Sequence, residues 1–319
     1  MTGSKKSIVQ DFGRRRVLQY GAVGAGLALM PWQMSLAQMT SDDATKAMRT
    51  RKIPSTGEML PVIGMGSSGS FSTRSEDTLA DLRTVMKRFV AMGGTLVDTS
   101  PTYGNAETNI GAIARDTGVR DALFMATKVH INGRQAGIDQ MAQSTEALGK
   151  PIDLMQIHNF IDLETQWKTL ERMKADGQVR YIGITHYLTS AFEELEHQMS
   201  TKDMDFVQFN YSIMTPDAEQ RLLPLAADRG IAVLVNRAYN DGRFFSQVKG
   251  RELPDYAQEF DCFSWGQFAL KYVLANDAVN AVIPATSDPK HLEDNMHAGY
   301  GALPDRAMQK RMRETIAAM

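Results

Sequence analysis

The chain has 319 residues, 43% of them hydrophobic and 23% charged, and its 35 basic side chains nearly balance its 37 acidic ones. This length suits one large globular domain or two ordinary ones, and the composition excludes a coiled coil and a low-complexity chain. The nearly neutral charge gives no indication of nucleic acid or of an anionic membrane as a partner. The single cysteine, Cys262, excludes an internal disulfide and a zinc site built on cysteines.

The first 37 residues have the layout of a secretory signal. Five basic residues and one acidic residue precede position 17, and residues 17–30 form an apolar run too short to favour a membrane-spanning helix. Ser35 and Ala37 are the small residues expected at positions −3 and −1 of a cleavage site before Gln38. We therefore expect no stable membrane span once this segment is removed.

Three consecutive arginines, Arg14, Arg15 and Arg16, stand directly before the apolar run. Followed by Val17 and Leu18, they resemble the twin-arginine (Tat) signal of bacterial exported proteins. The resemblance implies that the Tat export machinery is a partner and that residues 38–319 are a mature domain in the periplasm. The alternatives are a general secretory signal or an anchor that is not cleaved.

From residue 48 onwards, short apolar runs alternate with stretches of helical periodicity. Eight runs are predicted to be strands: 62–65, 95–98, 123–128, 154–158, 181–185, 206–210, 232–235 and 281–284. Seven stretches between them are predicted to be helices: 78–92, 107–116, 134–148, 163–176, 190–199, 216–228 and 264–275. This alternation predicts an α/β protein with the (β/α)8 TIM barrel fold.

Two further features bear on the fold. Residues 51–60 read as a hairpin around Ser-Thr-Gly, which we expect to close the N-terminal end of the barrel. The rival fold is a doubly wound sheet. Gly64, Gly66 and Gly69 have the spacing of its nucleotide-binding fingerprint, but no good helix opens there.

Polar side chains stand where the predicted strands end, which is where active sites lie in a TIM barrel. Each has an ordinary interpretation alone: a cap for Asp98, a lysine that reaches water for Lys128, a buried core histidine for His158. Ionisable groups at the ends of apolar strands are costly unless they are paired or functional. We therefore expect Asp98, Lys128 and His158 to meet, together with Tyr103 from the loop after the second strand.

These residue types suit the reduction of a carbonyl. A lysine cation near Tyr103 would lower the phenol pKa, and an aspartate would keep that lysine charged. A neutral histidine would donate a hydrogen bond to a carbonyl oxygen. Because no side chain supplies a hydride, a cofactor must do so.

The mature chain resembles the aldo-keto reductase superfamily over essentially its whole length. The matching blocks are 94–107 (GTLVDTSPTYGNAE), 126–128 (ATK), 156–159 (QIHN), 174–183 (KADGQVRYIG) and 283–295 (IPATSDPKHLEDN). The resemblance implies a reversible, NAD(P)H-dependent reduction of an aldehyde or ketone to an alcohol. The resemblance also implies a catalytic tetrad of Asp98, Tyr103, Lys128 and His158. In it Tyr103 would be the general acid, Lys128 and Asp98 would tune its pKa, and His158 would orient the small-molecule carbonyl substrate.

The same resemblance assigns the cofactor contacts. Thr185, His186 and Gln208 would hold the nicotinamide carboxamide, although Thr185-His186 replaces the usual Ser-Asn pair. Asn236 stands where many members have an aromatic platform. Arg237 would therefore contact the pyrophosphate, unless it pairs with a nearby acid. At the adenine end the contacts would come from Thr286, Ser287, Lys290, His291 and Asn295, and we expect NADP(H) rather than NAD(H).

Two other functions are compatible with the sequence. His130, His158 and His186 follow successive strands and could form a metal site of a barrel hydrolase, although the usual His-x-His after the first strand is missing. Alternatively, the barrel could bind a dinucleotide as a sensor or partner subunit with little or no turnover.

Overall fold

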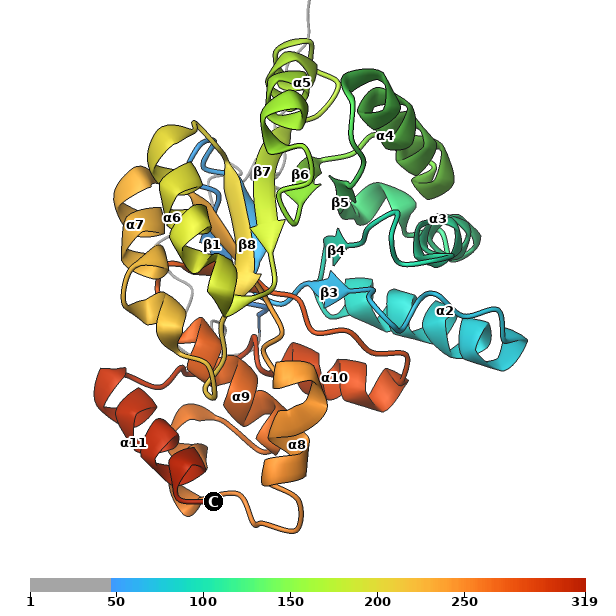
Figure 1. The fold of residues 1–319 in the computed structure, drawn as a ribbon. Coiled ribbons are helices and arrows are strands. Elements are labelled where there is room, and N and C mark those ends of the chain that lie inside the picture. The colour runs from blue at the N-terminus through green and yellow to red at the C-terminus, as the bar shows by residue number, and fades with distance from the viewer. Residues whose placement is uncertain (1–46) are drawn as a thin grey trace, which may run out of the picture. The chain divides into compact units, whose positions relative to one another are not determined.

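The computed structural model describes residues 47–319, and the signal predicted over residues 1–37 lies outside that part of the chain. Eight parallel strands form one sheet, and each pairs with the next along the chain. They are Met65–Gly66 (β3), Leu96–Asp98 (β4), Phe124–Val129 (β5), Leu154–His158 (β6), Tyr181–His186 (β7), Phe206–Asn210 (β8), Ala232–Asn236 (β9) and Val279–Val282 (β10). The predicted TIM barrel is confirmed (Figure 1).

Hydrogen bonds between its first and last strands close the barrel. Gly64 N–H donates to the carbonyl oxygen of Val282 at 2.9 Å, and Val282 N–H donates to that of Val62 at 3.0 Å. One step further, Gly66 N–H donates to Pro284 at 3.1 Å. These hydrogen bonds place residues 62–66 beside the last strand, and the regular strand there, Met65–Gly66, overlaps the predicted run 62–65 only at Met65.

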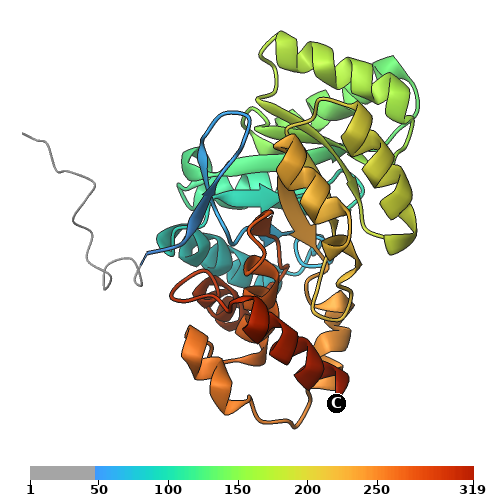
Figure 2. The same ribbon diagram turned by 90° about the vertical axis from the view of Figure 1, so that its left-hand side faces the viewer.

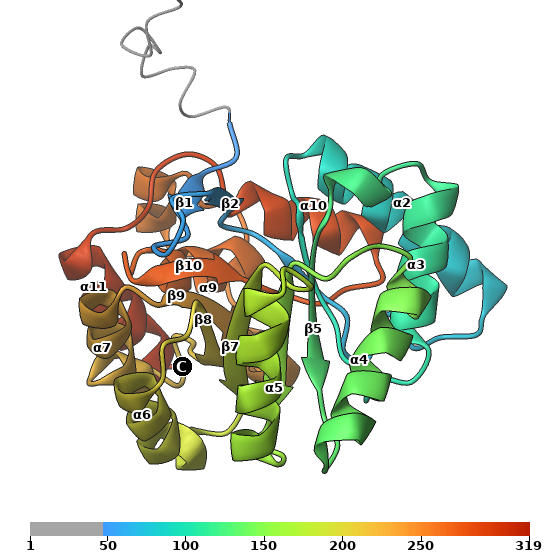
Figure 3. The same cartoon turned by 90° about the horizontal axis from the view of Figure 1, so that it is seen from above.

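The helices are Glu76–Ala91 (α2), Ala106–Asp116 (α3), Arg134–Leu148 (α4), Leu163–Ala175 (α5), Phe192–Thr201 (α6), Leu222–Arg229 (α7), Arg243–Gln247 (α8), Trp265–Leu274 (α9), Pro289–His297 (α10) and Arg306–Ala317 (α11). None of these helices is both long enough and apolar enough to span a membrane. Helices α2 to α7 lie around the outside of the strands (Figure 3).

The predicted hairpin is present and closes the N-terminal end of the barrel. Thr50–Lys52 (β1) pairs antiparallel with Met59–Pro61 (β2) (Figure 2). Ile53 and Leu60 from this hairpin are buried in a core cluster with residues from the strands, among them Phe124, Tyr181 and Phe206. The opposite, carboxyl end of the strands is therefore the end at which polar side chains are free to form a site.

One predicted helix is wrong in its extent. Residues 216–228 divide into a 3-10 turn, Asp217–Glu219, and the shorter α7. Arg221, with φ −140°, is not helical and separates them. Pro224 then lies in the first turn of α7, where its missing N–H costs no intrahelical hydrogen bond.

Close packing between α3 and α4 depends on one glycine. A Cβ built at Gly111 would lie 2.0 Å from the carbonyl oxygen of Ala147, far inside van der Waals contact. Only glycine permits the two backbones to approach this closely. The contact fixes α3, which begins just after the loop that carries Tyr103.

Candidate active site

Four neighbouring segments bring the predicted tetrad to the carboxyl end of the barrel. Asp98 ends β4, Lys128 is the penultimate residue of β5, and His158 ends β6. Tyr103 lies in the loop between β4 and α3. Since parallel neighbouring strands end at the same rim, the four side chains converge, as the sequence predicted.

Lys128 and Asp98 form a buried ion pair. Lys128 Nζ lies 2.7 Å from Asp98 Oδ2 and also donates to the carbonyl oxygen of Thr99 at 2.7 Å, and Lys128 is 0% exposed. Burial by itself lowers the pKa of Lys128, but Asp98 and Tyr103 outweigh it, so the net shift is upwards. The lysine is therefore held as a cation, which is the role predicted for Asp98.

The second carboxylate oxygen of Asp98 is held by two amides. Gln156 Nε2 and Gln208 Nε2 each donate to Asp98 Oδ1 at 3.0 Å. Gln208 Oε1 in turn accepts from Thr185 Oγ1 at 3.1 Å and from Asn236 Nδ2 at 3.2 Å. This network links β4, β6, β7, β8 and β9 across the barrel. It provides the hydrogen bonds that a buried carboxylate requires.

Tyr103 is half-buried between the lysine and the histidine. Lys128 Nζ lies 5.2 Å from the centre of its ring, and the His158 ring packs edge-on with centroids 5.9 Å apart. The expected lowering of its pKa is wrong as a net effect. Burial raises the pKa of Tyr103, and the Lys128 cation only partly offsets that shift. Tyr103 is therefore protonated at neutral pH, which is the form a proton donor needs.

His158 is neutral at physiological pH. Burial first, and then the Lys128 cation and the neighbouring imidazoles of His130 and His186, lower its pKa to about 3. Its Nδ1 lies 3.1 Å from Ser100 Oγ, while the His130 ring packs 5.0 Å away. This pKa is consistent with the neutral histidine that the sequence predicts.

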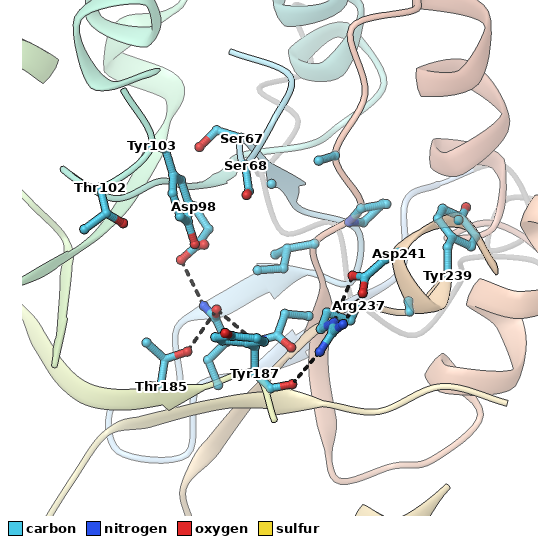
Figure 4. Close-up of a pocket in the computed structure, with 18 of the residues that line it drawn as sticks. Ser67, Ser68, Asp98, Thr102, Tyr103, Thr185, Tyr187, Arg237, Tyr239 and Asp241 are labelled. Atoms are coloured by element: carbon cyan, nitrogen blue, oxygen red, sulfur yellow. Dashed lines mark hydrogen bonds and ion pairs between the residues drawn. The ribbon is translucent and has the colours of Figure 1, made fainter. Parts of the chain in front are cut away.

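A cavity of about 740 Å³ opens over these residues. Figure 4 shows Asp98 and Tyr103 on one side of it, and Arg237, Tyr239 and Asp241 on the other. Four of the predicted cofactor residues line it: Thr185, Gln208, Asn236 and Arg237. The other six do not: His186, Thr286, Ser287, Lys290, His291 and Asn295.

The cavity wall fits the carboxamide of a nicotinamide ring. Asn159 Oδ1 and Asn236 Oδ1 are buried acceptors that find no hydrogen-bond partner within residues 47–319, and both residues line the cavity. A buried acceptor is costly unless a donor reaches it, so these atoms suit an NH2 group of a ligand. Gln208, in contrast, is already engaged by Asp98, Thr185 and Asn236, which makes it a support for the cavity wall.

His186 differs from its predicted role. Its Nδ1 accepts the Leu188 N–H at 3.2 Å, and its ring stacks on Tyr187 with centroids 5.7 Å apart and an interplanar angle of 8°. The ring centroids of His186 and its other aromatic neighbour, Phe160, are 5.0 Å apart. His186 therefore orients Tyr187, which does line the cavity.

Arg237 forms an ion pair with an acidic residue, Asp241, which was the alternative to a pyrophosphate contact in the sequence analysis. Its Nε donates to Asp241 Oδ1 at 2.8 Å, its Nη2 bonds Asp241 Oδ2, and its Nη1 donates to the Tyr187 carbonyl oxygen at 3.2 Å. The backbone of Arg237 is left-handed, with φ 56°, which is uncommon for this residue type. This conformation places the guanidinium in the wall of the cavity.

At the adenine end, helix α10 begins directly after the last strand and its loop. Asp288 caps α10 by accepting the Lys290 N–H at 2.7 Å, and Pro289 is the first helical residue. Asn295 Oδ1 accepts the Tyr239 hydroxyl at 2.6 Å, so its side chain is used inside the protein. Lys290 and His291 are exposed on the first turn, outside the cavity.

Several cavity residues were missed by the sequence analysis. Ser67 and Ser68 directly follow β3, and Asn159 directly follows β6. Polar residues at the carboxyl ends of barrel strands were the signal that identified Asp98, Lys128 and His158, and the same signal would have identified these three. Phe245 comes from the short helix α8, and no pattern in the sequence places that helix over the barrel.

Within residues 47–319, no group of three or more His, Cys, Asp or Glu side chains is arranged to hold a metal ion. His130 and His158 are close, but the Nδ1 of His130 faces the carbonyl oxygen of His158 at 3.3 Å. The three histidines therefore do not form the metal centre that the hydrolase alternative requires.

Comparison with known proteins shows which proteins this chain is similar to. Morphine 6-dehydrogenase of Pseudomonas putida is 26% identical over 272 residues, which are 79% of this chain and 86% of that protein. Aldo-keto reductase YhdN of Bacillus subtilis is 24% identical over 59% of this chain, and the match spans only 61% of that protein.

Solved structures share the fold. An aldo/keto reductase of Klebsiella pneumoniae, in complex with NADP and acetate, has a TM-score of 0.68 and 19% identity, over 85% of this chain and 95% of that one. Aldo-keto reductase AKR11C1 of Bacillus halodurans has a TM-score of 0.67 and 21% identity, over 84% and 96%. The model of the aldo/keto reductase family matches residues 62–313. The chain belongs to the aldo/keto reductase family and is an NAD(P)H-dependent oxidoreductase of that type.

Proposed function

We propose that the protein is an exported reductase that converts an aldehyde or a ketone to an alcohol and that prefers NADP(H). The observation that carries this proposal is the convergence of Tyr103, His158 and the Lys128–Asp98 ion pair on one cavity. The bound nicotinamide cofactor would supply the hydride. The protein's own residues would position the carbonyl and deliver the proton.

Tyr103 is the proton donor in this proposal. Its hydroxyl is protonated at neutral pH, since the ordinary pKa of a phenol is about 10 and burial raises it further. When it gives up the proton, the adjacent Lys128 cation stabilises the phenolate, and Asp98 keeps that cation in place. His158, neutral at pH 7, donates a hydrogen bond to the substrate oxygen without competing for the proton.

The cofactor would lie along the wall formed by β6 to β9. Asn159 and Asn236 offer the carboxamide acceptors that have no partner in the described part of the chain, and Arg237 offers a cation for the pyrophosphate. NADP(H) is favoured because solved relatives carry NADP and NADPH, and because Lys290 and His291 stand at the N-terminus of α10. A 2′-phosphate is stabilised by cations and by a helix N-terminus.

Export by the Tat pathway is the second part of the proposal. It is supported by the arginines at positions 14–16 before a short apolar run. Tat machinery transports folded proteins, so a cofactor bound in the cytoplasm would travel with the enzyme. This accounts for a dinucleotide-dependent enzyme in a compartment where free dinucleotide is scarce.

One experiment tests cofactor and activity together. Protein purified without added cofactor is denatured, and any released nucleotide is identified by mass spectrometry. Protein freed of nucleotide is then titrated with NADPH and NADH, and its activity is assayed on a panel of aldehydes and ketones. Tighter binding of NADPH with carbonyl-dependent oxidation supports the proposal. Binding of neither nucleotide, or binding without turnover of any carbonyl, contradicts it.

A further inference from the structure

A buried serine contacts the Nδ1 side of the His158 ring. Ser100 is 0% exposed and lies two residues after Asp98. Its Oγ is 3.1 Å from His158 Nδ1 and 2.9 Å from Thr102 Oγ1, and it accepts the Thr102 backbone N–H at 3.2 Å. Among the described residues, no other side chain has a hydrogen bond to this ring nitrogen.

The hydrogen bonds around Ser100 constrain the histidine. A serine hydroxyl has one proton to donate and two lone pairs to accept with. The Thr102 backbone N–H fills one lone pair. The Thr102 hydroxyl is exposed and has its own proton, so it is able to fill the other lone pair as a donor. In that arrangement the Ser100 proton is directed at His158 Nδ1, which must then be unprotonated.

We propose that Ser100 is a positioning residue that holds His158 in the tautomer with its proton on Nε2, the nitrogen available to the cavity. A neutral imidazole has only one N–H, so a hydrogen bond from Nε2 to a carbonyl oxygen requires this tautomer. The catalytic consequence rests on the proposed function, but the tautomer itself does not. His158 stays neutral because burial lowers its pKa to about 3, with Lys128, His130 and His186 adding to the shift.

Ser100→Ala removes the one side-chain partner that Nδ1 has within residues 47–319, and it leaves the backbone in place. Both tautomers then become accessible, and the ring loses one fixed contact. We expect kcat for carbonyl reduction to fall roughly five- to tenfold, the worth of one neutral hydrogen bond. Dinucleotide affinity should stay within about twofold, because Ser100 does not line the cavity.

The direct test is nuclear magnetic resonance of the full chain labelled with ¹⁵N-histidine, at pH 7.5. Long-range ¹H–¹⁵N spectra distinguish a protonated ring nitrogen from an unprotonated one, and His158→Gln assigns the signal. We expect the Nε2–H pattern in the unmodified protein and a mixed pattern in Ser100→Ala. Ser144→Ala is the matched control, since Ser144 is also a buried serine but bonds Glu107 away from the site; the His158 signal should not change there.

The outcomes separate this inference from the proposed function. An Nδ1–H pattern in the unmodified protein, or an Nε2–H pattern unchanged in Ser100→Ala, overturns the inference even if the enzyme reduces carbonyls. A Ser100-dependent Nε2–H pattern supports it even if no carbonyl is turned over. Because the first measurement uses the unmodified chain, a Ser100→Ala variant that fails to fold does not prevent the test.

Discussion

Lys128 Nζ lies 2.7 Å from Asp98 Oδ2, and both side chains are almost completely buried, at 1% and 4% exposure. A buried ion pair gives little net stability compared with apolar residues, yet removal of one partner leaves an uncompensated charge. The pair is therefore explained better by what it does for Tyr103 than by what it does for the fold.

Lys128→Met should destabilise the protein strongly. The variant leaves the Asp98 carboxylate buried without its cation, and breaking such a pair costs about 3–5 kcal/mol of unfolding free energy. Adding Asp98→Asn removes the unpaired charge while keeping an oxygen for Gln156 and Gln208, so the double variant should recover a large part of the loss. Urea unfolding of the three proteins measures this, and a Lys128→Met variant as stable as the parent would contradict it.

Tyr103→Phe should lose turnover and keep cofactor binding. Removing the proton donor lowers kcat for carbonyl reduction about 10²- to 10⁴-fold, while the ring still fills its place beside His158. Dinucleotide affinity, measured by fluorescence titration, should remain within about twofold. Tyr300→Phe is the matched control, because its hydroxyl bonds the Met92 carbonyl oxygen outside the cavity. A near-normal kcat in Tyr103→Phe would remove Tyr103 from the proton-donor role.

His158 should contribute to acid sensitivity. Its pKa is about 3 in the folded protein and about 6.5 in an unfolded chain, so the unfolded state binds more protons between these values. Stability from this group is complete above pH 6.5 and is lost as the pH falls towards 3, by up to about 1.4 kcal/mol per pH unit.

His158→Gln isolates this effect, because all other titrating groups are shared with the parent. Unfolding free energies from urea titrations at pH 4.5, 6 and 7.5 should fall less steeply for the variant than for the parent. Equal slopes would mean that His158 is not held neutral in the folded protein.

Three of the four tetrad residues could be predicted from the sequence because their places depend on strand ends. Asp98, Lys128 and His158 each close an apolar run, and parallel strands bring such ends together whatever the loops do. The net pKa direction of Tyr103 could not be predicted, because it depends on how deeply the loop buries the phenol. The spacing of residues also did not show that His186 packs against Phe160 and Tyr187 rather than facing the cavity.

Asp241 and the pyrophosphate of the cofactor should compete for the guanidinium of Arg237. Arg237 bonds both oxygens of Asp241 in the wall of the cavity, so a pyrophosphate must share or replace that partner. We expect Arg237→Ala to weaken dinucleotide binding roughly tenfold, and Asp241→Asn to leave it equal or tighter at low salt. Fluorescence titration at two ionic strengths measures both. Weaker binding in Asp241→Asn and unchanged binding in Arg237→Ala would show that the ion pair only shapes the loop.

Export should depend on the guanidinium groups before the apolar run rather than on their charge. Replacing Arg14, Arg15 and Arg16 together by lysine keeps the charge but removes the planar fork that distinguishes arginine. We expect the lysine variant to remain in the cytoplasm as the full-length chain.

A variant with Lys5 and Lys6 changed to glutamine removes charge nearby and should still be exported. Cell fractionation followed by mass measurement of the mature N-terminus distinguishes these cases, since cleavage before Gln38 is expected only for exported protein. Efficient export of the lysine variant would replace the twin-arginine assignment with a general secretory signal, and the cofactor would then have to be bound after transport.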